Sequence, residues 1–253
     1  MHITSWNVNS LNVRLPHVLQ YLQASAPDVL GLQELKQTDD AVDVAAFAAA
    51  GYHIASHGQR TYNGVALIAR QPLTDIVRGI PGYADEQARA IAANIDELRV
   101  LNLYVPNGKA VGDEKYSYKL HWLDAVTRYI DDLRREHPKL VITGDYNIAP
   151  ADLDVHDPDK WRDQILCSAP ERQALANILA LGFQDAYRAL HPDTQQFSWW
   201  DYRMGGLKRN IGLRIDLTLT SDALTLADAD IDTAPRHWER PSDHAPAWVR
   251  IGQ

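Results

Sequence analysis

The chain has 253 residues, 45% of them hydrophobic, and a formal net charge of −8 at pH 7. This is enough for one large core or two small ones, but no stretch approaches the ~20 consecutive apolar residues of a bilayer helix. The start of the chain lacks a basic segment followed by an apolar run, and Cys167 is its only cysteine, which excludes an intrachain disulfide. We therefore expect a cytoplasmic protein without a membrane partner.

Short apolar runs recur along the chain, each bounded by turn-forming or polar residues, as in the buried strands of a layered fold. They cover residues 29–32, 65–69, 100–104, 140–143, 215–219 and 247–251. Two apolar stripes with helical spacing lie among them and predict helices over 15–22 and 120–133. Pro16 fits the first of these helices only if it lies in the first turn, where a missing N–H costs nothing.

Two further helices are expected from their boundary residues. Ser168, followed three residues later by Glu171, has the pattern of a capping box, and Gly182 would end the helix that this box starts. A short helix over 45–50 would stop at Gly51. The alternation of strands and helices is typical of an α/β protein with helix-covered sheets. It does not separate one doubly wound sheet from two stacked sheets.

Polar residues with catalytic potential stand next to the predicted strands. They are Asn7, Asn9, Glu34, Asp145, Asn147, Asp216, Asp243 and His244. A rigid α/β scaffold aims the groups at its strand ends into one cleft. Carboxylate and amide oxygens suit Mg²⁺ or Mn²⁺, and an aspartate beside a histidine suits acid–base work on a phosphoryl group. Alone, each such residue is most often a turn former or helix cap, so the prediction depends on the whole set.

Other chemistries lack their sequence patterns. There is no cysteine pair, no His-Glu-x-x-His segment and no glycine-rich loop that cradles phosphates. Cys167 is interpreted as a small packed side chain, because no histidine or other base accompanies it.

The negative net charge argues against a nonspecific DNA-binding protein, which usually carries a basic surplus. A metal-dependent nuclease differs, since its acidic residues serve as ligands. Residues 202–215 include no acidic residue and four basic ones, namely Arg203, Lys208, Arg209 and Arg214. We therefore predict a basic loop on an acidic protein.

Six segments then match a known family in its order. They are SWNVNSL (5–11), GLQELK (31–36), NLYVPNG (102–108), GDYNIAP (144–150), GLRID (212–216) and PSDHAP (241–246). The chain resembles the exonuclease III and abasic-site endonuclease family, within the endonuclease/exonuclease/phosphatase superfamily. The resemblance implies a single domain over 1–253 with a four-layered α/β sandwich, two mixed sheets face to face between helices. It also implies a magnesium-dependent phosphodiesterase that acts on double-stranded DNA with abasic sites, nicks or 3′ ends, as a monomer.

The resemblance assigns roles to individual residues. Glu34 would be the main metal ligand, supported by Asn7 and Asn9. Asp145 would orient or deprotonate the attacking water, with Asn147 holding water or phosphate. His244 would contact the scissile phosphate, and Asp216 would position His244. Asp243 would lie near the metal or the leaving oxygen. Tyr104 and Asn107 would also contact the phosphate.

DNA binding is expected from the aromatic and basic segment 197–214. The resemblance places Trp199, Leu213 and Ile215 on the wall of a pocket for a flipped abasic nucleotide, whose extrusion is cheap because its stacking is already lost. Leu166 belongs to a loop near the DNA that varies among relatives. Its bulk would narrow the space for an intact duplex and favour processing of 3′ ends over internal incision.

Two alternatives compete with this interpretation. One is another hydrolase of the superfamily, acting on a sphingolipid, an inositol phosphate or an RNA tail. The second is a noncatalytic nucleic-acid-binding regulator, like the catabolite repression control proteins that resemble exonuclease III. Such a regulator has no chemical need for the complete set Glu34, Asp145, Asp216, Asp243 and His244, and this chain has all of them.

Overall fold

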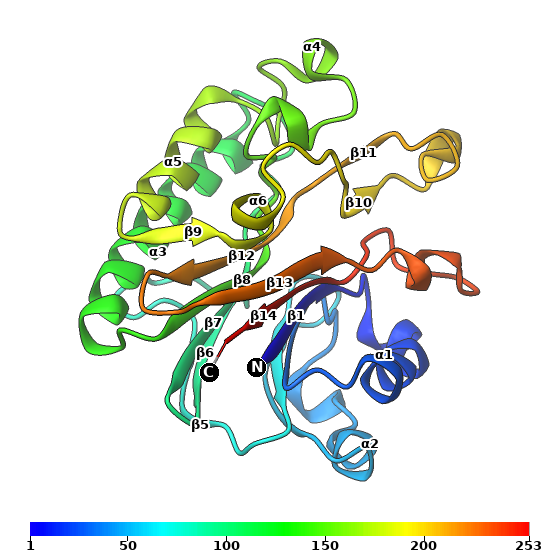
Figure 1. Cartoon of the computed structure of the whole chain (residues 1–253), viewed down its shortest axis with the longest axis vertical. Coiled ribbons are helices and arrows are strands. Elements are labelled where there is room, and N and C mark those ends of the chain that lie inside the picture. Colours follow the sequence, from blue (N-terminus) through cyan, green and yellow to red (C-terminus); the bar gives the residue numbers. More distant parts are fainter. Residues whose placement is uncertain (253) are drawn as a thin grey trace.

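The computed structural model describes residues 1–252, in which the chain forms two six-stranded sheets that face each other (Figure 1). The first has the order β13-β14-β1-β2-β4-β3. Its strands are β1 (His2–Asn7), β2 (Val29–Gln33), β3 (His53–His57), β4 (Val65–Ala69), β13 (Leu226–Ile231) and β14 (Ala247–Ile251). The second has the order β5-β6-β7-β8-β12-β9. Its strands are β5 (Thr74–Arg78), β6 (Ala90–Ile95), β7 (Leu98–Tyr104), β8 (Leu140–Asp145), β9 (Phe183–Asp185) and β12 (Asp216–Ser221).

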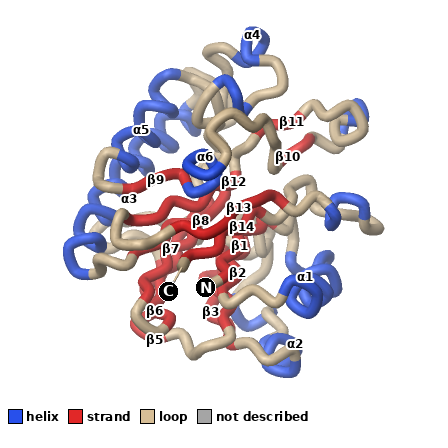
Figure 2. Tube along the Cα trace, viewed as in Figure 1, coloured by secondary structure: helices blue, strands red, loops and turns tan. Residues whose placement is uncertain are grey.

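Helices cover the outer faces of both sheets (Figure 2). The longer ones are α1 (Leu11–Ser25), α3 (Glu114–Glu136) and α5 (Ala169–Leu179). The shorter ones are α2 (Val44–Ala49), α4 (Pro158–Trp161) and α6 (Ala186–Leu190), with 3₁₀ turns η1 (Asp39–Ala41), η2 (Asp152–Asp154), η3 (Arg203–Gly205) and η4 (Ala234–His237). A two-stranded ribbon of β10 (Trp199–Trp200) and β11 (Gly212–Leu213) projects from the sandwich. Within residues 1–252, no helix is both long enough and apolar enough to cross a bilayer.

Three apolar layers hold the four structural layers together. Ile3 of β1 and Val141 of β8 belong to the buried layer between the sheets. Val18 of α1 packs on the outer face of the first sheet, and Val126 of α3 packs on the outer face of the second. Ile142 follows Val141 but belongs to the α3 layer, because successive side chains of a strand point to opposite faces. The predicted α/β class and the four-layered sandwich are therefore confirmed.

A buried polar bridge joins the two sheets close to one edge. Asn102 of β7 donates from Nδ2 to the carbonyl oxygens of Leu32 (2.9 Å) and Ala66 (2.8 Å) in the first sheet. Gln33 donates from Nε2 to Asn102 Oδ1 (2.7 Å) and to Ser5 Oγ (3.1 Å). Because buried amides without partners are costly, this network favours one relative placement of the two sheets.

Most element predictions agree with the structure, with one correction. Strands β4 and β14 have the predicted bounds, and the capping box is present, with the Ser168 N–H donating to Glu171 Oε2 (3.1 Å). The expectation that Pro16 lies in the first helical turn is wrong, because α1 already begins at Leu11. Pro16 and Asn12, whose carbonyl loses its helical partner, are both exposed, so water replaces the missing bond at little cost.

Candidate active site

One edge of the sandwich collects the predicted polar residues. Asn7 ends β1, Glu34 follows β2, and Asp145 ends β8. Asp216 begins β12, opposite Asp145 in the antiparallel ladder. His244 precedes β14, which pairs antiparallel with β1. The ends of some strands and the beginnings of others thus place all of these side chains at the same edge.

Asp145, Asp216 and His244 form the buried centre of this edge. The Asp216 carboxylate accepts a hydrogen bond from His244 Nδ1 (2.8 Å) and another from Ser198 Oγ (2.6 Å). Because a carboxylate only accepts, Nδ1 carries the proton and the other ring nitrogen is directed elsewhere. His244 Nε2 lies 3.7 Å from Asp145 Oδ2. Asp216 therefore orients the imidazole toward Asp145.

Burial of these groups together shifts their proton affinities. Burial raises the pKa of Asp145 to about 7, and the Asp216 charge adds to the rise while His244 opposes it. Burial alone would lower the pKa of His244, but Asp216 and Asp145 outweigh it and raise that pKa to about 10. At neutral pH the imidazole is therefore a cation, and Asp145 binds a proton more readily than an ordinary carboxyl group does. A group with such a pKa is well matched to proton transfer.

Glu34 lies beside this centre and is partly exposed. Asn7 donates from Nδ2 to Glu34 Oε1 (2.8 Å) and to Asp145 Oδ2 (2.9 Å). The Asn7 amide oxygen accepts from the backbone N–H of Asn9 (2.9 Å). The amide therefore presents donors and not its oxygen to the two carboxylates. Lys36 adds a cation, with Nζ 2.9 Å from Glu34 Oε2.

Glu34, Asp145 and His244 form a group that fits a divalent cation. One ligand atom from each lies within 4.8 Å of the others. The two carboxylates offer the hard oxygen ligands that Mg²⁺ and Mn²⁺ prefer. His244, with its pKa raised to about 10, keeps its proton at neutral pH and is the weakest candidate ligand of the three.

The backbone is strained at three of these positions. Asn9, Glu34 and Asn147 have φ values of +46°, +56° and +48°. Asparagine tolerates this left-handed region, whereas glutamate rarely adopts it. Such conformations cost about 1–3 kcal/mol each and persist where the surrounding structure enforces them, often at functional sites.

A pair of asparagine amides continues the site. Asn107 donates from Nδ2 to Asn147 Oδ1 (3.0 Å), and Asn147 donates from its own Nδ2 to the carbonyl of Val105 (3.0 Å). The backbone N–H of Asn147 donates to Asp145 Oδ1 (2.9 Å). Tyr104 lies close by, and burial, followed by two nearby carboxylates, raises its pKa well above the usual value. Its hydroxyl stays protonated and can donate to an anion.

Asp243 accepts two hydrogen bonds at the margin of this centre. Its two oxygens accept from Asn9 Nδ2 (2.9 Å) and from Trp199 Nε1 (3.0 Å). It is also outside the group of Glu34, Asp145 and His244. The structure therefore brings Asp243 to the aromatic side of the site.

A cavity of about 990 Å³ adjoins the site on this aromatic side. Its apolar lining includes Trp161, Ile165, Leu166, Trp199 and Met204. Leu213 and Ile215, predicted on the wall, are 0% and 2% exposed and belong to the buried cluster that contains Leu166. They support the wall, whereas Leu166 and Trp199 line it directly.

The predicted basic loop is only partly a surface. Arg214 is fully buried and pairs with Asp154 (2.7 Å) and Asp185 (2.7 Å). The prediction that Arg214 contributes to a basic surface loop is therefore wrong. The residue lies between two buried neighbours just before β12, and the acidic partners come from distant segments that the local sequence does not reveal.

The other basic residues of the loop are exposed. Arg203 is held by Asp201, with Nη2 2.5 Å from Oδ2. Arg203 and Arg209 both line the aromatic cavity, whereas Lys208 is outside its lining. The usable positive charge of the loop is therefore concentrated on Arg209 and Lys208.

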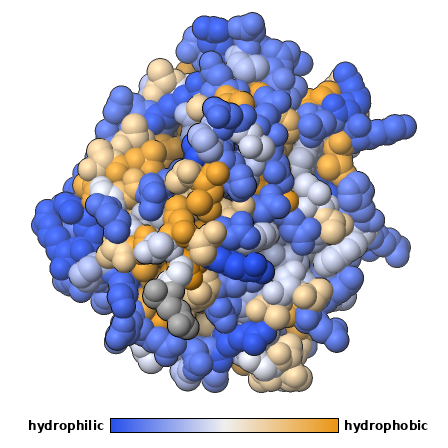
Figure 3. Space-filling model, in the orientation of Figure 1, coloured by the Kyte–Doolittle hydropathy of each residue, from blue (hydrophilic) through white to orange (hydrophobic). Residues whose placement is uncertain are grey.

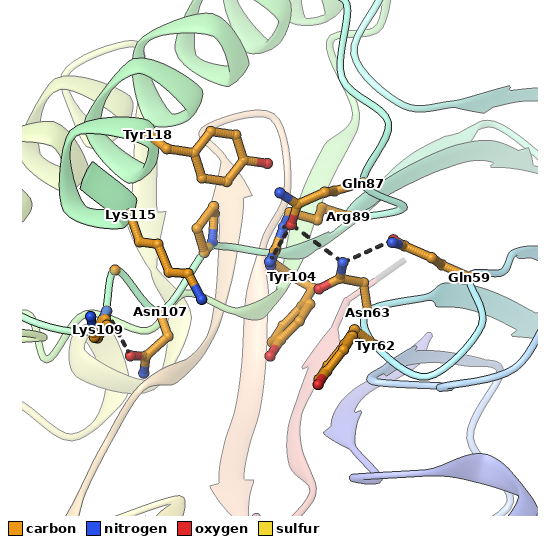
Figure 4. Close-up of a pocket in the computed structure, with 12 residues that line it drawn as sticks. Gln59, Tyr62, Asn63, Gln87, Arg89, Tyr104, Asn107, Lys109, Lys115 and Tyr118 are labelled. Atoms are coloured by element: carbon orange, nitrogen blue, oxygen red, sulfur yellow. Dashed lines mark hydrogen bonds between the residues drawn. The ribbon is translucent and has the colours of Figure 1, made fainter. Parts of the chain in front are cut away.

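A second cavity, of about 550 Å³, includes Tyr104 and Asn107 in its lining (Figure 4). Three cationic side chains surround it, those of Arg89, Lys109 and Lys115. The Arg89 guanidinium packs over the Tyr104 ring, 4.8 Å from its centroid. Asn107 lines both cavities and so lies where they meet.

Sequence reasoning gave no role to several residues that shape the site. Lys36 could have been found from its place two residues after Glu34 in the same motif. Ser198, which bonds Asp216, and Arg89, which covers Tyr104, had no local signal.

A buried Asp–His–Asp centre beside carboxylates that fit a divalent cation, at the edge of a layered α/β sandwich, is the site of a hydrolase. A model of the endonuclease/exonuclease/phosphatase family matches residues 4–244. Exodeoxyribonuclease III of Haemophilus influenzae is 38% identical, over 99% of this chain and 100% of that protein. The chain belongs to the endonuclease/exonuclease/phosphatase family.

Solved structures resemble it closely. A 3′ phosphatase from Neisseria bound to a product DNA hairpin is 45% identical with a TM-score of 0.99, and each chain is covered completely. An AP endonuclease from Archaeoglobus fulgidus is 35% identical with a TM-score of 0.96, again over both whole chains.

Proposed function

We propose that this chain is a DNA-repair nuclease that hydrolyses phosphodiester bonds at abasic sites or at 3′ ends of double-stranded DNA. The single observation that carries the proposal is the buried Asp145–His244–Asp216 arrangement beside Glu34. The relatives support the substrate class, since their names include an exodeoxyribonuclease, a 3′ phosphatase bound to DNA and an AP endonuclease. We further propose that residues 1–253 act as a single domain and as a monomer.

The reaction is proposed to need a divalent cation, Mg²⁺ or Mn²⁺. Glu34 and Asp145 would hold it, and the cation would neutralise charge on the phosphate oxygens. Lys36 already pairs with Glu34, so a bound cation would compete with or displace this ammonium.

Proton transfer is assigned to the buried centre. Asp145, whose pKa burial raises to about 7, would accept a proton from the attacking water. The His244 imidazolium would stabilise negative charge that develops on the phosphate, because it is a fixed cation in a buried site. Asp216 would hold that imidazolium in place. Asn147, Asn107 and Tyr104 would donate hydrogen bonds to the same phosphate.

The two cavities suggest a path for the DNA strand. Because Asn107 lines both of them, a phosphate beside it would have neighbouring nucleotides on either side. Arg89, Lys109 and Lys115 would face backbone phosphates in the second cavity, and Trp199 would stack against a sugar in the first. Asp243 and Asn9 would keep Trp199 in position through their hydrogen bonds.

We infer that the cavity floor favours 3′-end processing over internal incision. Leu166 is 4% exposed and fills the floor with a branched side chain. A terminal phosphate or sugar needs less of that space than a nucleotide flipped out of an intact duplex.

The decisive experiment incubates the purified protein with two labelled duplexes, one with an abasic site and one with a 3′-phosphate at a nick, with MgCl₂ or with EDTA. Cleavage that requires the metal and is lost in Asp145→Asn supports the proposal. Tight DNA binding without any cleavage would instead favour the noncatalytic regulator.

A further inference from the structure

A buried ion pair lies directly behind the Asn107–Asn147 amide pair. Lys119 comes from α3 and Glu171 from the first turn of α5, and both side chains are 0% exposed. Because the Lys119 side chain is fully buried, it does not present a surface to a bound strand. Its position nevertheless links three segments of the site.

The Lys119 ammonium uses all three of its protons. They go to a carboxylate oxygen of Glu171 and to the backbone carbonyl oxygens of Asn147 (2.7 Å) and Asn107 (3.3 Å). An ammonium has three donors, so its capacity is filled. The two carbonyls belong to the residues whose side chains bond to each other across the site. One cation therefore fixes the two loops that present these amides.

Glu171 extends the connection to the cavity floor. Its Oε1 accepts from the backbone N–H of Leu166 (3.1 Å), and its Oε2 accepts from the N–H of Ser168 (3.1 Å). Leu166 has a φ of +71°, a strained value for a branched side chain, and its carbonyl accepts from the N–H of Ala149 (2.8 Å). The Glu171 carboxylate thus holds the strained backbone turn at Leu166, in addition to capping the start of α5.

The choice of residue types argues for more than packing. Burying a lysine and a glutamate costs desolvation, and an apolar pair of similar size is often as stable or more so. Burial accordingly lowers the pKa of Lys119, while Glu171 and Asp145 oppose that change. What an apolar pair could not do is bond two loop carbonyls and a loop N–H at the same time.

We propose that the Lys119–Glu171 pair is a positioning element of the active site, which holds the Asn107–Asn147 amides toward the substrate phosphate and fixes Leu166 relative to them. The proposal rests on the proposed function for its kinetic consequence. Its structural consequence, the fixed orientation of the two amides, can be measured without any substrate.

The test compares Lys119→Met, Glu171→Gln and the uncharged double variant with the wild-type protein. The matched control is Leu133→Ala, a truncation of a buried side chain near the other end of the same helix, which lines a different cavity together with Val77 and Arg99. For each we would measure thermal stability, kcat and KM on the 3′-phosphate duplex at a temperature where every variant is folded, and the side-chain NH₂ resonances of Asn107 and Asn147 by NMR.

We expect kcat of Lys119→Met to fall by about 10- to 100-fold, as for a misplaced group near the reacting atoms, with a smaller change in KM. The two NH₂ resonances shift or broaden. The double variant regains stability but not kcat, whereas Leu133→Ala loses stability and keeps kcat.

A kcat within about twofold of wild type in the folded Lys119→Met variant would overturn the proposal, as would unchanged NH₂ resonances. If Lys119→Met does not fold, the double variant decides by the same criteria. If the wild-type protein cleaves neither duplex, the proposed function has failed, and the NMR comparison still tests the positioning of the amides.

Discussion

Asp145 and Asp216 are direct cross-strand partners, the last residue of β8 opposite the first residue of β12. His244 contacts both, at 2.8 Å from Asp216 and 3.7 Å from Asp145. Two buried carboxylates this close would repel, so the imidazolium beside them stabilises the arrangement. Because both aspartates are on a hydrogen-bonded ladder, the geometry is set by sheet register and not by a mobile loop.

Removing the proton acceptor should abolish most of the activity. Asp145→Asn keeps the size of the side chain but cannot take a proton from water. We expect kcat to fall about 10³-fold, equivalent to ~4 kcal/mol in the barrier, with the fold intact. Steady-state kinetics on the 3′-phosphate duplex provide the measurement, and Asp96→Asn, an exposed substitution in a remote turn, is the control.

The two aspartates should act as a unit. The double variant Asp145→Asn/Asp216→Asn is expected to lose far less than the product of the single losses, because both carboxylates contact the same His244 imidazole and form one buried centre. If the losses of kcat in the two single variants instead multiplied in the double variant, Asp216 would act independently of Asp145 and His244.

His244 should make stability depend on pH. Burial alone would lower its pKa, but Asp216 and Asp145 raise it from 6.5 to about 10 in the folded protein. The folded state then binds the proton more tightly than the unfolded state, so this contribution is fully present below pH 6.5 and is lost as the pH rises toward about 10. The free energy of unfolding, measured from pH 6 to 10 in the presence of a chelator, should decline less steeply in His244→Gln than in the wild-type protein. Parallel curves for the two proteins would contradict the raised pKa.

A divalent cation should stabilise the protein through Glu34. A ligand that binds only the folded state adds ~2.7 kcal/mol at a concentration 100 times its Kd. MgCl₂ should therefore raise Tm of the wild-type protein and have little effect on Glu34→Gln. Glu97→Gln, at an exposed glutamate paired with Lys139, is the matched control. Full activity in excess EDTA would exclude the proposed metal requirement.

Two arginines of the same loop should behave in opposite ways. Arg214→Met removes the buried arginine that pairs with Asp185 and with Asp154, which keeps Arg188, and should cost ~3–5 kcal/mol of unfolding free energy. Arg209→Ala, at an exposed position, should change stability by less than about 0.5 kcal/mol. It should instead weaken DNA binding and reduce the salt dependence of the affinity by about one counterion. Chemical denaturation and salt titrations of a labelled duplex separate the two outcomes.

The sequence predicted most strands and helices, and the strand ends that carry the site, because these depend on local patterns. An apolar run such as 65–69 is recognised from its continuous apolar residues and the polar residues that bound it, and Glu34 and Asp145 lie at the ends of two other such runs. The two-sheet arrangement came from the resemblance alone, since periodicity within a strand carries no information about a facing sheet. What failed were side-chain directions that depend on distant partners.

Two residues illustrate this limit. Arg214 looked like part of a basic surface because its acidic partners, Asp154 and Asp185, are far away in sequence. For Asp243, the resemblance implied a place near the metal or leaving oxygen, but it gave no sign that Trp199 from the β10–β11 ribbon donates to its carboxylate. Neither contact follows from spacing, because each depends on how separate segments pack.

Leu166 offers a test of substrate choice. Leu166→Gly removes the side chain from the cavity floor and suits the local φ of +71°, although it leaves a gap under Trp199. We expect abasic-site incision to gain relative to 3′-phosphate removal by about 10-fold, the size of effect that a changed apolar contact produces in a pocket.

The control for this substitution is Leu213→Ala, which opens space in the same cluster without facing the cavity. For Leu213→Ala, the ratio of kcat/KM on the abasic duplex to kcat/KM on the 3′-phosphate duplex should stay at the wild-type level. The lost side chain affects the stability of the protein and not the shape of the cavity floor. If the wild-type protein processed both duplexes at comparable rates, the proposal that Leu166 narrows the cavity would already be refuted. There would then be no preference for 3′ ends that Leu166→Gly could change.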